Sequence, residues 1–243
     1  MALSLRQKMT IIALAFYWPT LFVLGHIPIP QVVYQAEVSD KSLHFLAYLI
    51  LVFLLWFAIN PDKKVNWRKA TPWWILLVVV SYGIADEISQ GYMGRNCDIL
   101  DFFTNLIGSL TGLVLFTIFT FWPAALLVTG IVIFGITNIA RANLADMLPI
   151  ANAMFHLFAY AAFTVLWIQC LHTFKPIKIS KINLLVPALA GPIAFLFTVK
   201  LSSMILGRVV VMSDIIVSIG AIIATVGVFY LTTSYQKNPS TES

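Results

Sequence analysis

The sequence predicts an all-α integral membrane protein with about eight transmembrane helices, arranged as two parallel four-helix repeats with both termini in the cytoplasm. Its composition is 60% hydrophobic and 10% charged, whereas soluble domains carry roughly 25% charged residues. Apolar runs of about 20 residues, the length that spans the hydrocarbon core, recur along the chain. The basic residues also alternate between connections. These three observations exclude a soluble globular enzyme.

The first apolar segment, about residues 9–25, follows Arg6 and Lys8 as a signal peptide would. It continues to Gly25 without a small-x-small cleavage site, so we expect a retained helix. The third segment is cleanly apolar only over 73–85, and the fifth follows the fourth with almost no loop. The other seven helices are predicted at 42–60, 72–91, 99–121, 122–140, 151–171, 183–206 and 209–234.

Ten of the fifteen Lys and Arg residues lie in alternate connections, at the N-terminus, in 63–69, in 175–181 and at Lys237. The positive-inside rule therefore puts both termini in the cytoplasm. Most acidic residues fall near the opposite face, so we expect the chemistry of this protein to face outward. The basic residues are sorted by loop and are not interleaved with exposed aromatics, which argues against a nucleic-acid partner.

An internal repeat is visible when the chain is shifted by about 112 positions. His44 to Tyr48 then fall on His156 to Tyr160, and one further residue of offset brings Asp101 onto Asp214 and Gly94-Arg95 onto Gly207-Arg208. The repeat predicts a first unit over 1–121, a diverged second unit over 122–234 and a polar cytoplasmic tail over 235–243.

The second copy differs from the first at the polar positions. Lys200 stands where Glu87 stands, Ser203 replaces Gln90 and Ser218 replaces Asn105. The second unit therefore keeps the shape and loses the acidic and amide groups. Lys200 is expected to act as a counter-charge to the carboxylates of the first half.

Polar residues interrupt or border the second, third and fourth apolar segments. A charge toward the middle of a membrane helix costs roughly 2.5 to 3.5 kcal/mol on insertion scales, so a cluster of them indicates a site. The orientation of the helices brings them to the outer leaflet. They are His44, Asp86, Glu87, Gln90, Arg95, Asp98, Asp101 and Asn105.

Some of these residues have structural explanations. Asp98 is expected to cap the fourth helix, since its carboxylate can accept from free backbone N–H groups. Asp101, Asn105, Gly108 and Gly112 share one helix face, and the two glycines are expected to allow close helix packing. Arg95 fits either an interfacial ion pair or a ligand contact.

The sequence predicts catalytic roles for His44 and Glu87, because a desolvated carboxylate beside positive groups is suited to proton transfer. Gln90, Arg95, Asp101 and Asn105 are the predicted ligand-binding residues. His44, Glu87 and Asp101 together would suit zinc or manganese. No tight spacing such as H-x-x-x-H supports a metal, so neither a metal nor another cofactor is predicted. His26 and His172 are interpreted as interfacial residues.

The motifs D-K-S-L-H-F-L-A-Y at 40–48, D-E-I-S-Q at 86–90, R-N-C-D-I-L-D at 95–101 and N-L-I-G at 105–108 resemble the VanZ-like family of bacterial membrane proteins. The resemblance covers about residues 38–115. It implies a multi-pass protein of the bacterial cytoplasmic membrane, built of four-helix units and related to teicoplanin resistance and the cell envelope. The family motif falls on His44, Glu87, Gln90, Arg95, Asp101 and Asn105.

Three functions fit these observations. The first is an outward-facing polar pocket that binds or processes an anionic envelope component, either a lipid-linked phosphate or a glycopeptide, with catalysis left open. The second is a non-catalytic accessory subunit of a larger membrane-protein complex. The third is a transporter, which the scarcity of polar residues in the inner halves of the helices disfavours. Membrane lipids are partners in every case.

Overall fold

The computed structural model describes residues 3–27, 39–93, 98–139, 144–174 and 181–235, and these residues form helices and short connections only. Eight of the helices are long and apolar enough to span a membrane, which confirms the predicted all-helical membrane architecture. They are α1 (Leu5–His26), α3 (Asp40–Ile59), α4 (Ala70–Tyr92), α5 (Ile99–Ile118), α6 (Phe121–Ile139), α8 (Pro149–Phe174), α9 (Lys181–Ile205) and α10 (Met212–Tyr235).

The sequence marks several of the helix starts. Ser4, Ser39 and Asp98 are the N-caps of α1, α3 and α5, and each side chain accepts a hydrogen bond from a backbone N–H of the first turn. Such a bond satisfies one of the four amides that a helix start leaves without a partner. The predicted capping role of Asp98 is confirmed. A further one-turn helix, α7 (Leu144–Met147), was not predicted.

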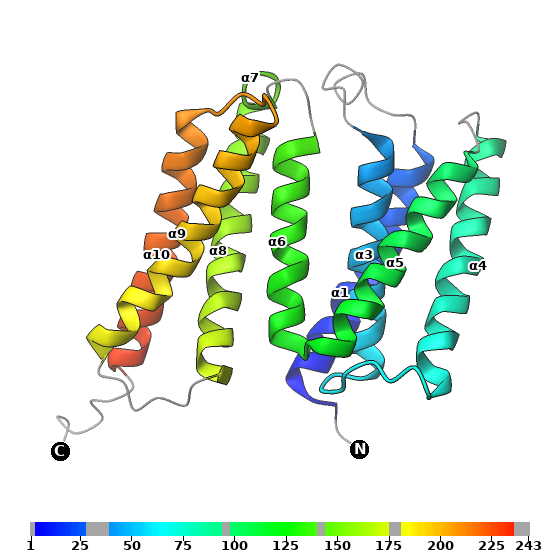
Figure 1. Cartoon of the computed structure of the whole chain (residues 1–243), viewed down its shortest axis with the longest axis horizontal. Helices are drawn as coiled ribbons and strands as arrows, with labels where there is room; N and C mark the ends of the chain where they lie inside the picture. The colour runs from blue at the N-terminus through cyan, green and yellow to red at the C-terminus, as the bar shows by residue number, and fades with distance from the viewer. Residues whose placement is uncertain (1–2, 28–38, 94–97, 140–143, 175–180, 236–243) are drawn as a thin grey trace. The chain divides into compact units, whose positions relative to one another are not determined.

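The chain forms two compact units, residues 1–135 and 136–243, whose boundary lies within α6. In the first unit α3 lies at the centre and contacts α1, α4 and α5 (Figure 1). Its buried side chains pack with those of α5, and α6 contributes Ala124 and Val128 to the same core. A helix surrounded by other helices can be apolar on every face. Among the eight candidate spans α3 is the most buried, and it shares the highest mean hydropathy with α10.

The two glycines of α5 bring that helix against α3. A Cβ on Gly108 would lie 2.5 Å from the backbone oxygen of Phe45, and one on Gly112 would overlap the Val52 side chain. Small residues allow the close backbone approach on which membrane helix packing depends. The predicted packing role of this face is confirmed, and it places Asp101 and Asn105, on the same stripe, against the start of α3.

Side chains of α1 hold it antiparallel to α3 by two hydrogen bonds. Gln7 donates from Nε2 to the Ala58 carbonyl at 2.9 Å, and Tyr17 donates from its hydroxyl to the Ala47 carbonyl at 2.9 Å. Residues near the start of α1 thus pair with the end of α3. The end of α1 consequently lies with the start of α3.

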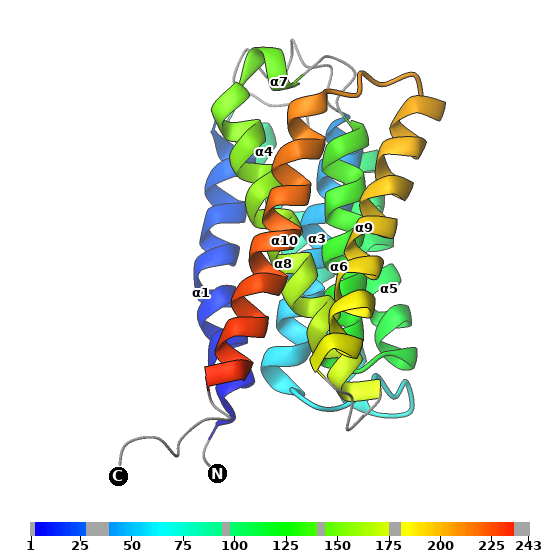
Figure 2. The same cartoon turned by 90° about the vertical axis from the view of Figure 1, so that its left-hand side faces the viewer.

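In the second unit α8, α9 and α10 pack against one another (Figure 2). Trp167 of α8 donates from its indole nitrogen to the Pro187 carbonyl of α9 at 2.8 Å. Its ring lies against Gly191, where a Cβ would overlap it. Phe163 and Phe195 stack with centroids 4.2 Å apart. These contacts fasten α9 to α8.

Candidate functional site

The polar residues of the first unit gather where α1 and α4 end and α3 and α5 begin. His44, in the second turn of α3, is the central side chain. Its Nδ1 lies 3.0 Å from Oδ1 of Asn105 on α5, across 61 positions of sequence. Its Nε2 faces Asp40 Oδ1 at 3.8 Å and Asp101 Oδ2 at 4.0 Å. The last two separations exceed those of a hydrogen bond.

Lys41 joins α3 to the first turn of α5. Its Nζ donates to Asp98 Oδ2 at 2.9 Å and to Asp101 Oδ1 at 3.2 Å. The hydrogen bond from Lys41, together with one from the Leu100 amide, holds the pKa of the Asp98 carboxyl below its usual range. We call Asp40, Lys41, His44, Asp98, Asp101 and Asn105 the His44 cluster.

The His44 cluster has an exposed rim and a buried floor. The side chains of Asp40 and Lys41 are each 47% exposed, whereas Asp101 and Asn105 are buried at 5% and 2%. Water and solutes can therefore reach the first turn of α3. The buried side chains of Asp101 and Asn105 lie next to this turn.

Glu87 of α4 lies beside this floor. It is only 4% exposed, and among the residues that the structure describes only the Asp98 backbone N–H makes a weak contact with a carboxylate that otherwise has no hydrogen-bond donor. Its charged neighbours are His44 and Asp101 of the His44 cluster and Asp86 of its own helix. Its carboxylate therefore faces the His44 cluster.

A second unsatisfied group comes from Asn105. The amide oxygen binds His44, but the buried Nδ2 has no acceptor among the described residues. Burying a polar group without a partner costs about 1 to 3 kcal/mol. A donor from α5 and an acceptor from α4, both buried and both unsatisfied, mark the floor as a place for a water or a ligand.

Gln90 and Asp86 lie on the side of α4 that faces α1. Gln90 donates from Nε2 to Asp86 Oδ2 at 3.1 Å, and both side chains approach Gly25. His26 Nδ1 is 3.8 Å from Asp86 Oδ1 and 2.7 Å from the Phe22 carbonyl, to which it donates. His26 is thus buried in a polar contact, although the sequence was interpreted as placing it at the membrane interface.

The structure brings His44, Asp101 and Asn105 into contact and sets Glu87 next to them, whereas Gln90 points toward α1. Arg95 lies outside the described residues. Sequence reasoning missed Asp40 and Lys41, because charged residues at a helix start are usual at a membrane surface. A signal was nevertheless present, since Asp40 precedes His44 by one helical turn and therefore shares its face.

The second unit holds a related set of residues, which we call the His156 cluster: Asn152, His156, Lys200, Asp214 and Ser218. His156 Nε2 lies 3.3 Å from Asp214 Oδ2, and its Nδ1 lies 3.3 Å from the Ser218 hydroxyl. Lys200 donates to Asp214 Oδ2 at 3.1 Å and Asn152 donates to Oδ1 at 2.7 Å. Lys200 was expected to face the carboxylates of the first half; it instead pairs within its own unit.

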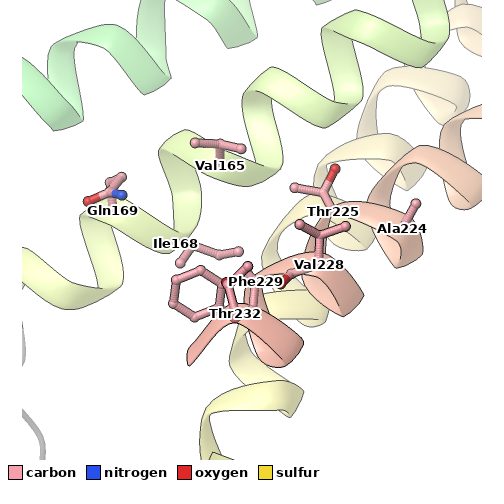
Figure 3. Close-up of a pocket in the computed structure, with 8 residues that line it drawn as sticks. All are labelled: Val165, Ile168, Gln169, Ala224, Thr225, Val228, Phe229 and Thr232. Atoms are coloured by element: carbon pink, nitrogen blue, oxygen red, sulfur yellow. Dashed lines mark hydrogen bonds between the residues drawn. The ribbon is translucent and has the colours of Figure 1, made fainter. Parts of the chain in front are cut away.

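Two pockets lined by described residues are apolar. One lies between α8 and α10 (Figure 3) and has a volume of about 390 Å³. The other lies between α1 and Tyr82 of α4. Such linings fit acyl chains or neighbouring apolar helices, and they provide few polar groups that could bind a charged headgroup. The polar cluster of the first unit is therefore the better candidate for a specific site.

Asp40, His44 and Asp101 are also a possible metal-binding group, because one ligand atom from each lies within 4.8 Å of the others. Glu87, which the sequence suggested as the third member, is replaced in this set by Asp40.

Comparison with known proteins gives one family match. Residues 5–120 match the family described as VanZ/LLP1. The matched segment contains α1, α3, α4 and α5, and hence every described residue of the His44 cluster together with Glu87 and Gln90. None of the curated proteins and none of the solved structures compared with the chain matches it.

Proposed function

The chain belongs to the VanZ-like family of membrane proteins through residues 5–120, and from this premise we propose that the His44 cluster binds or processes an anionic component of the cell envelope. The ligand class is a lipid-linked phosphate or a glycopeptide-type molecule. The proposed location is the bacterial cytoplasmic membrane, with both termini in the cytoplasm and the cluster facing outward. Antibiotic resistance is the expected phenotype.

The observation that supports this proposal most strongly is the convergence of polar groups from separate helices on one buried floor below an exposed rim. Asn105 is 2% exposed and Glu87 4%, and neither is fully hydrogen-bonded. Membrane helices tolerate such groups where they serve a ligand or a proton. Structural packing alone would favour apolar side chains.

Each group has a role in the proposal. Lys41, at the rim, and Arg95 bind phosphate or carboxylate oxygens through charge-assisted hydrogen bonds. Asn105 offers its free Nδ2 to a ligand oxygen. His44 and Glu87 exchange a proton with the bound molecule if a reaction follows. Gln90 and Asp101 orient these groups.

The excess of negative charge around the His44 cluster limits how an anion can bind there. Among the described residues at this end of the unit, five carboxylates face one lysine and two histidines: Asp40, Asp86, Glu87, Asp98 and Asp101 against Lys41, His26 and His44. An anion is repelled by carboxylates unless further positive charge is present. Its binding therefore depends on Lys41 and Arg95.

The binding test uses purified protein in neutral detergent, titrated with a polyprenyl phosphate and followed by tryptophan fluorescence. Lys41→Ala and Arg95→Ala should each weaken binding by roughly 10- to 100-fold, the value of a lost charged hydrogen bond. Arg208→Ala, at the corresponding position of the second unit, is the matched control. Equal binding by all four proteins would contradict the proposal.

In cells, Glu87→Gln and Arg95→Ala should abolish the envelope or resistance phenotype while membrane insertion stays intact. Insertion is measured by fractionation and protease protection. Wild-type behaviour in both variants would refute a role for the cluster.

A non-catalytic accessory subunit is the second candidate. It is favoured by the cross-helix hydrogen bonds of Lys41 and His44, which would hold α3 to α5 without any ligand. In that case the protein should co-purify stoichiometrically with a membrane complex. Asp101→Ala should then reduce thermal stability and leave any ligand affinity unchanged.

A further inference from the structure

The protonation of His44 is restricted by Asn105. The Asn105 amide oxygen can only accept, so the Nδ1 of His44, 3.0 Å away, donates to it. In the neutral imidazole the Nε2 lone pair then points at the oxygens of Asp40 and Asp101. A lone pair aimed at two carboxylates is unfavourable unless a cation lies between them, and the Lys41 ammonium bonds the other Asp101 oxygen, Oδ1.

The distances distinguish a bound ion from a direct ion pair. A charge-assisted bond between an imidazolium and a carboxylate is about 2.7 to 2.9 Å long, whereas Nε2 lies 3.8 and 4.0 Å from the two oxygens. Ligand atoms about 2.0 to 2.2 Å from a zinc ion are roughly 3.4 Å apart in a tetrahedral site and at most about 4.4 Å apart. The observed spacing fits ligands on different sides of one ion.

Two further features point to a ligand at this position. A metal-binding histidine almost always donates its other ring N–H to an oxygen that fixes its orientation, and Asn105 does so here. Glu87, which is 4% exposed and has no full hydrogen bond, adds a third carboxylate beside His44 and Asp101. A water held by the ion would give that carboxylate a partner.

In the His156 cluster a lysine contacts the carboxylate oxygen that the histidine faces, Asp214 Oδ2. In the first unit Lys41 instead donates to Asp101 Oδ1, and Oδ2 is the oxygen that faces His44. In the second unit Lys200 donates to Asp214 at 3.1 Å, and Asn152 donates to the other oxygen. Glu87 corresponds to Lys200, because each lies 14 positions before its aspartate, Asp101 or Asp214. Asp40 corresponds to Asn152, because each lies four positions before its histidine, His44 or His156. The first unit therefore has two carboxylates where the second has an ammonium and an amide.

We propose that Asp40, His44 and Asp101 bind a divalent first-row cation, Zn²⁺ or Mn²⁺, that Asn105 orients His44, and that the ion takes the place that the Lys200 ammonium has in the second unit. An imidazole with carboxylates suits these ions, whereas Ca²⁺ and Mg²⁺ prefer oxygen ligands alone. The ion would also supply positive charge toward an anionic ligand. The site itself does not require the proposed function.

The first experiment measures metal binding to the purified, tag-free full chain in detergent, with no envelope ligand present. After removal of metal by a chelator and re-addition of Zn²⁺ or Mn²⁺, the wild type should bind about one ion per chain. His44→Gln should lose this binding, and Asn105→Ala should weaken it by roughly 10- to 100-fold. His156→Gln, the same change in the second unit, should bind as the wild type does, and Ca²⁺ should not compete.

The second experiment exchanges the charges between the units. Glu87→Lys should abolish ion binding and leave a folded protein, because a lysine at this spacing reaches the aspartate in the second unit. Lys200→Glu combined with Asn152→Asp should instead raise the bound metal to about two ions per chain. Circular dichroism and size-exclusion profiles establish that each variant is folded.

Three results would overturn the inference. They are a wild type that binds neither ion, binding that persists in His44→Gln, and an equal loss in His156→Gln. In each case His44 would act as an imidazolium partner of the two carboxylates. A variant that loses ion binding but still binds polyprenyl phosphate would refute only the idea that the ion supplies positive charge to the anionic ligand. The metal site and the proposed function can therefore fail separately.

Discussion

At the scale of a single residue, Glu87 is a group whose burial lowers the stability of the first unit. A buried ionised carboxylate without full hydrogen bonds keeps its desolvation cost and gains little in return. Two of its three charged neighbours, Asp86 and Asp101, are themselves acidic, and the third is His44. Such groups persist mostly where they bind or react with something.

Glu87→Gln should therefore raise the free energy of unfolding of the metal-free protein by about 1 to 3 kcal/mol, because it removes the unpaired charge and keeps the volume. Thermal unfolding in detergent with a chelator measures this. Asp62→Asn is the control, since Asp62 forms an exposed ion pair with Arg6 at 2.7 Å and such pairs contribute about 0 to 1 kcal/mol. A lower melting temperature for Glu87→Gln would contradict the account.

Gly108 is the residue on which the contact of α3 with α5 depends. Gly108→Ala should lower the free energy of unfolding by about 1 to 3 kcal/mol, the usual cost of overpacking, because the new Cβ would meet the Phe45 carbonyl. Thermal unfolding followed by tryptophan fluorescence measures the change.

Gly220→Ala provides the comparison for Gly108, because no atom lies within 4 Å of a Cβ placed there. Alanine is the better helix former by roughly 1 kcal/mol. That variant should be as stable as the wild type or slightly more so, and equal destabilisation of both would show that steric contact is not the cause.

At this scale the sequence predicted that some polar residues lie together, and it missed others. His44, Asp101 and Asn105 could be found because polar groups inside apolar helices are costly and need a reason. Lys41 and His26 could not, because a basic or aromatic residue at a helix end is common at a membrane surface. Their partners, Asp98 and Asp86, are about 60 positions away, and only the packing of the helices shows the contact.

Among the elements, α1 depends on few interactions. Of its 22 residues only Thr10 and His26 are buried, so its position against α3 depends on partly buried contacts and on the hydrogen bonds from Gln7 and Tyr17. Its lipid-facing surface gives no preference for one orientation over another. Specific polar contacts therefore determine where it lies.

Tyr17→Phe should destabilise the protein by about 1 kcal/mol, the net value of one hydrogen bond, and should increase proteolysis near α1. Limited proteolysis in detergent and thermal unfolding both report it. Tyr92→Phe makes the same chemical change at a residue that is 89% exposed, and it should have no effect. Similar losses in both variants would exclude the bond to Ala47 as the cause.

The spans themselves were predictable from apolar length. The third segment, cleanly apolar only over 73–85, extends as α4 to Tyr92 because Asp86, Glu87 and Gln90 are buried against other helices. The fifth follows the fourth with almost no loop and is the separate helix α6. The one-turn helix α7 has no apolar periodicity of its own, since four residues are too few to show any.

At the scale of the whole molecule we predict that both termini lie in the cytoplasm, because the described residues contain eight candidate spanning helices and the basic connections favour the cytoplasmic side. A C-terminal green fluorescent protein should therefore fluoresce, and a C-terminal alkaline phosphatase should be inactive. The opposite results are expected for fusions after Ile27, at the end of α1. Phosphatase activity at the C-terminus would reverse the predicted orientation and the outward-facing cluster with it.

Shifting the sequence against itself indicated residues of the second unit that the structure brings into contact, but it did not indicate the Asp214 partner of Lys200. The shift of about 112 positions identified His156, Asp214 and Ser218 as the counterparts of the His44 cluster, and these residues contact one another. It could not show that Lys200 reaches Asp214, because that contact joins the last turns of α9 to the first turn of α10. Only the fold of the unit brings those turns together.

The internal neutralisation of Asp214 by Lys200 has a consequence for biosynthesis. Both charges enter the bilayer on consecutive helices, so they can cancel as the nascent hairpin leaves the translocon, before any solute is recruited. Among the described residues of the first unit, no lysine or arginine pairs with Glu87 in this way. The assembly of the first unit should accordingly be the slower step and the one that membrane quality-control proteases detect.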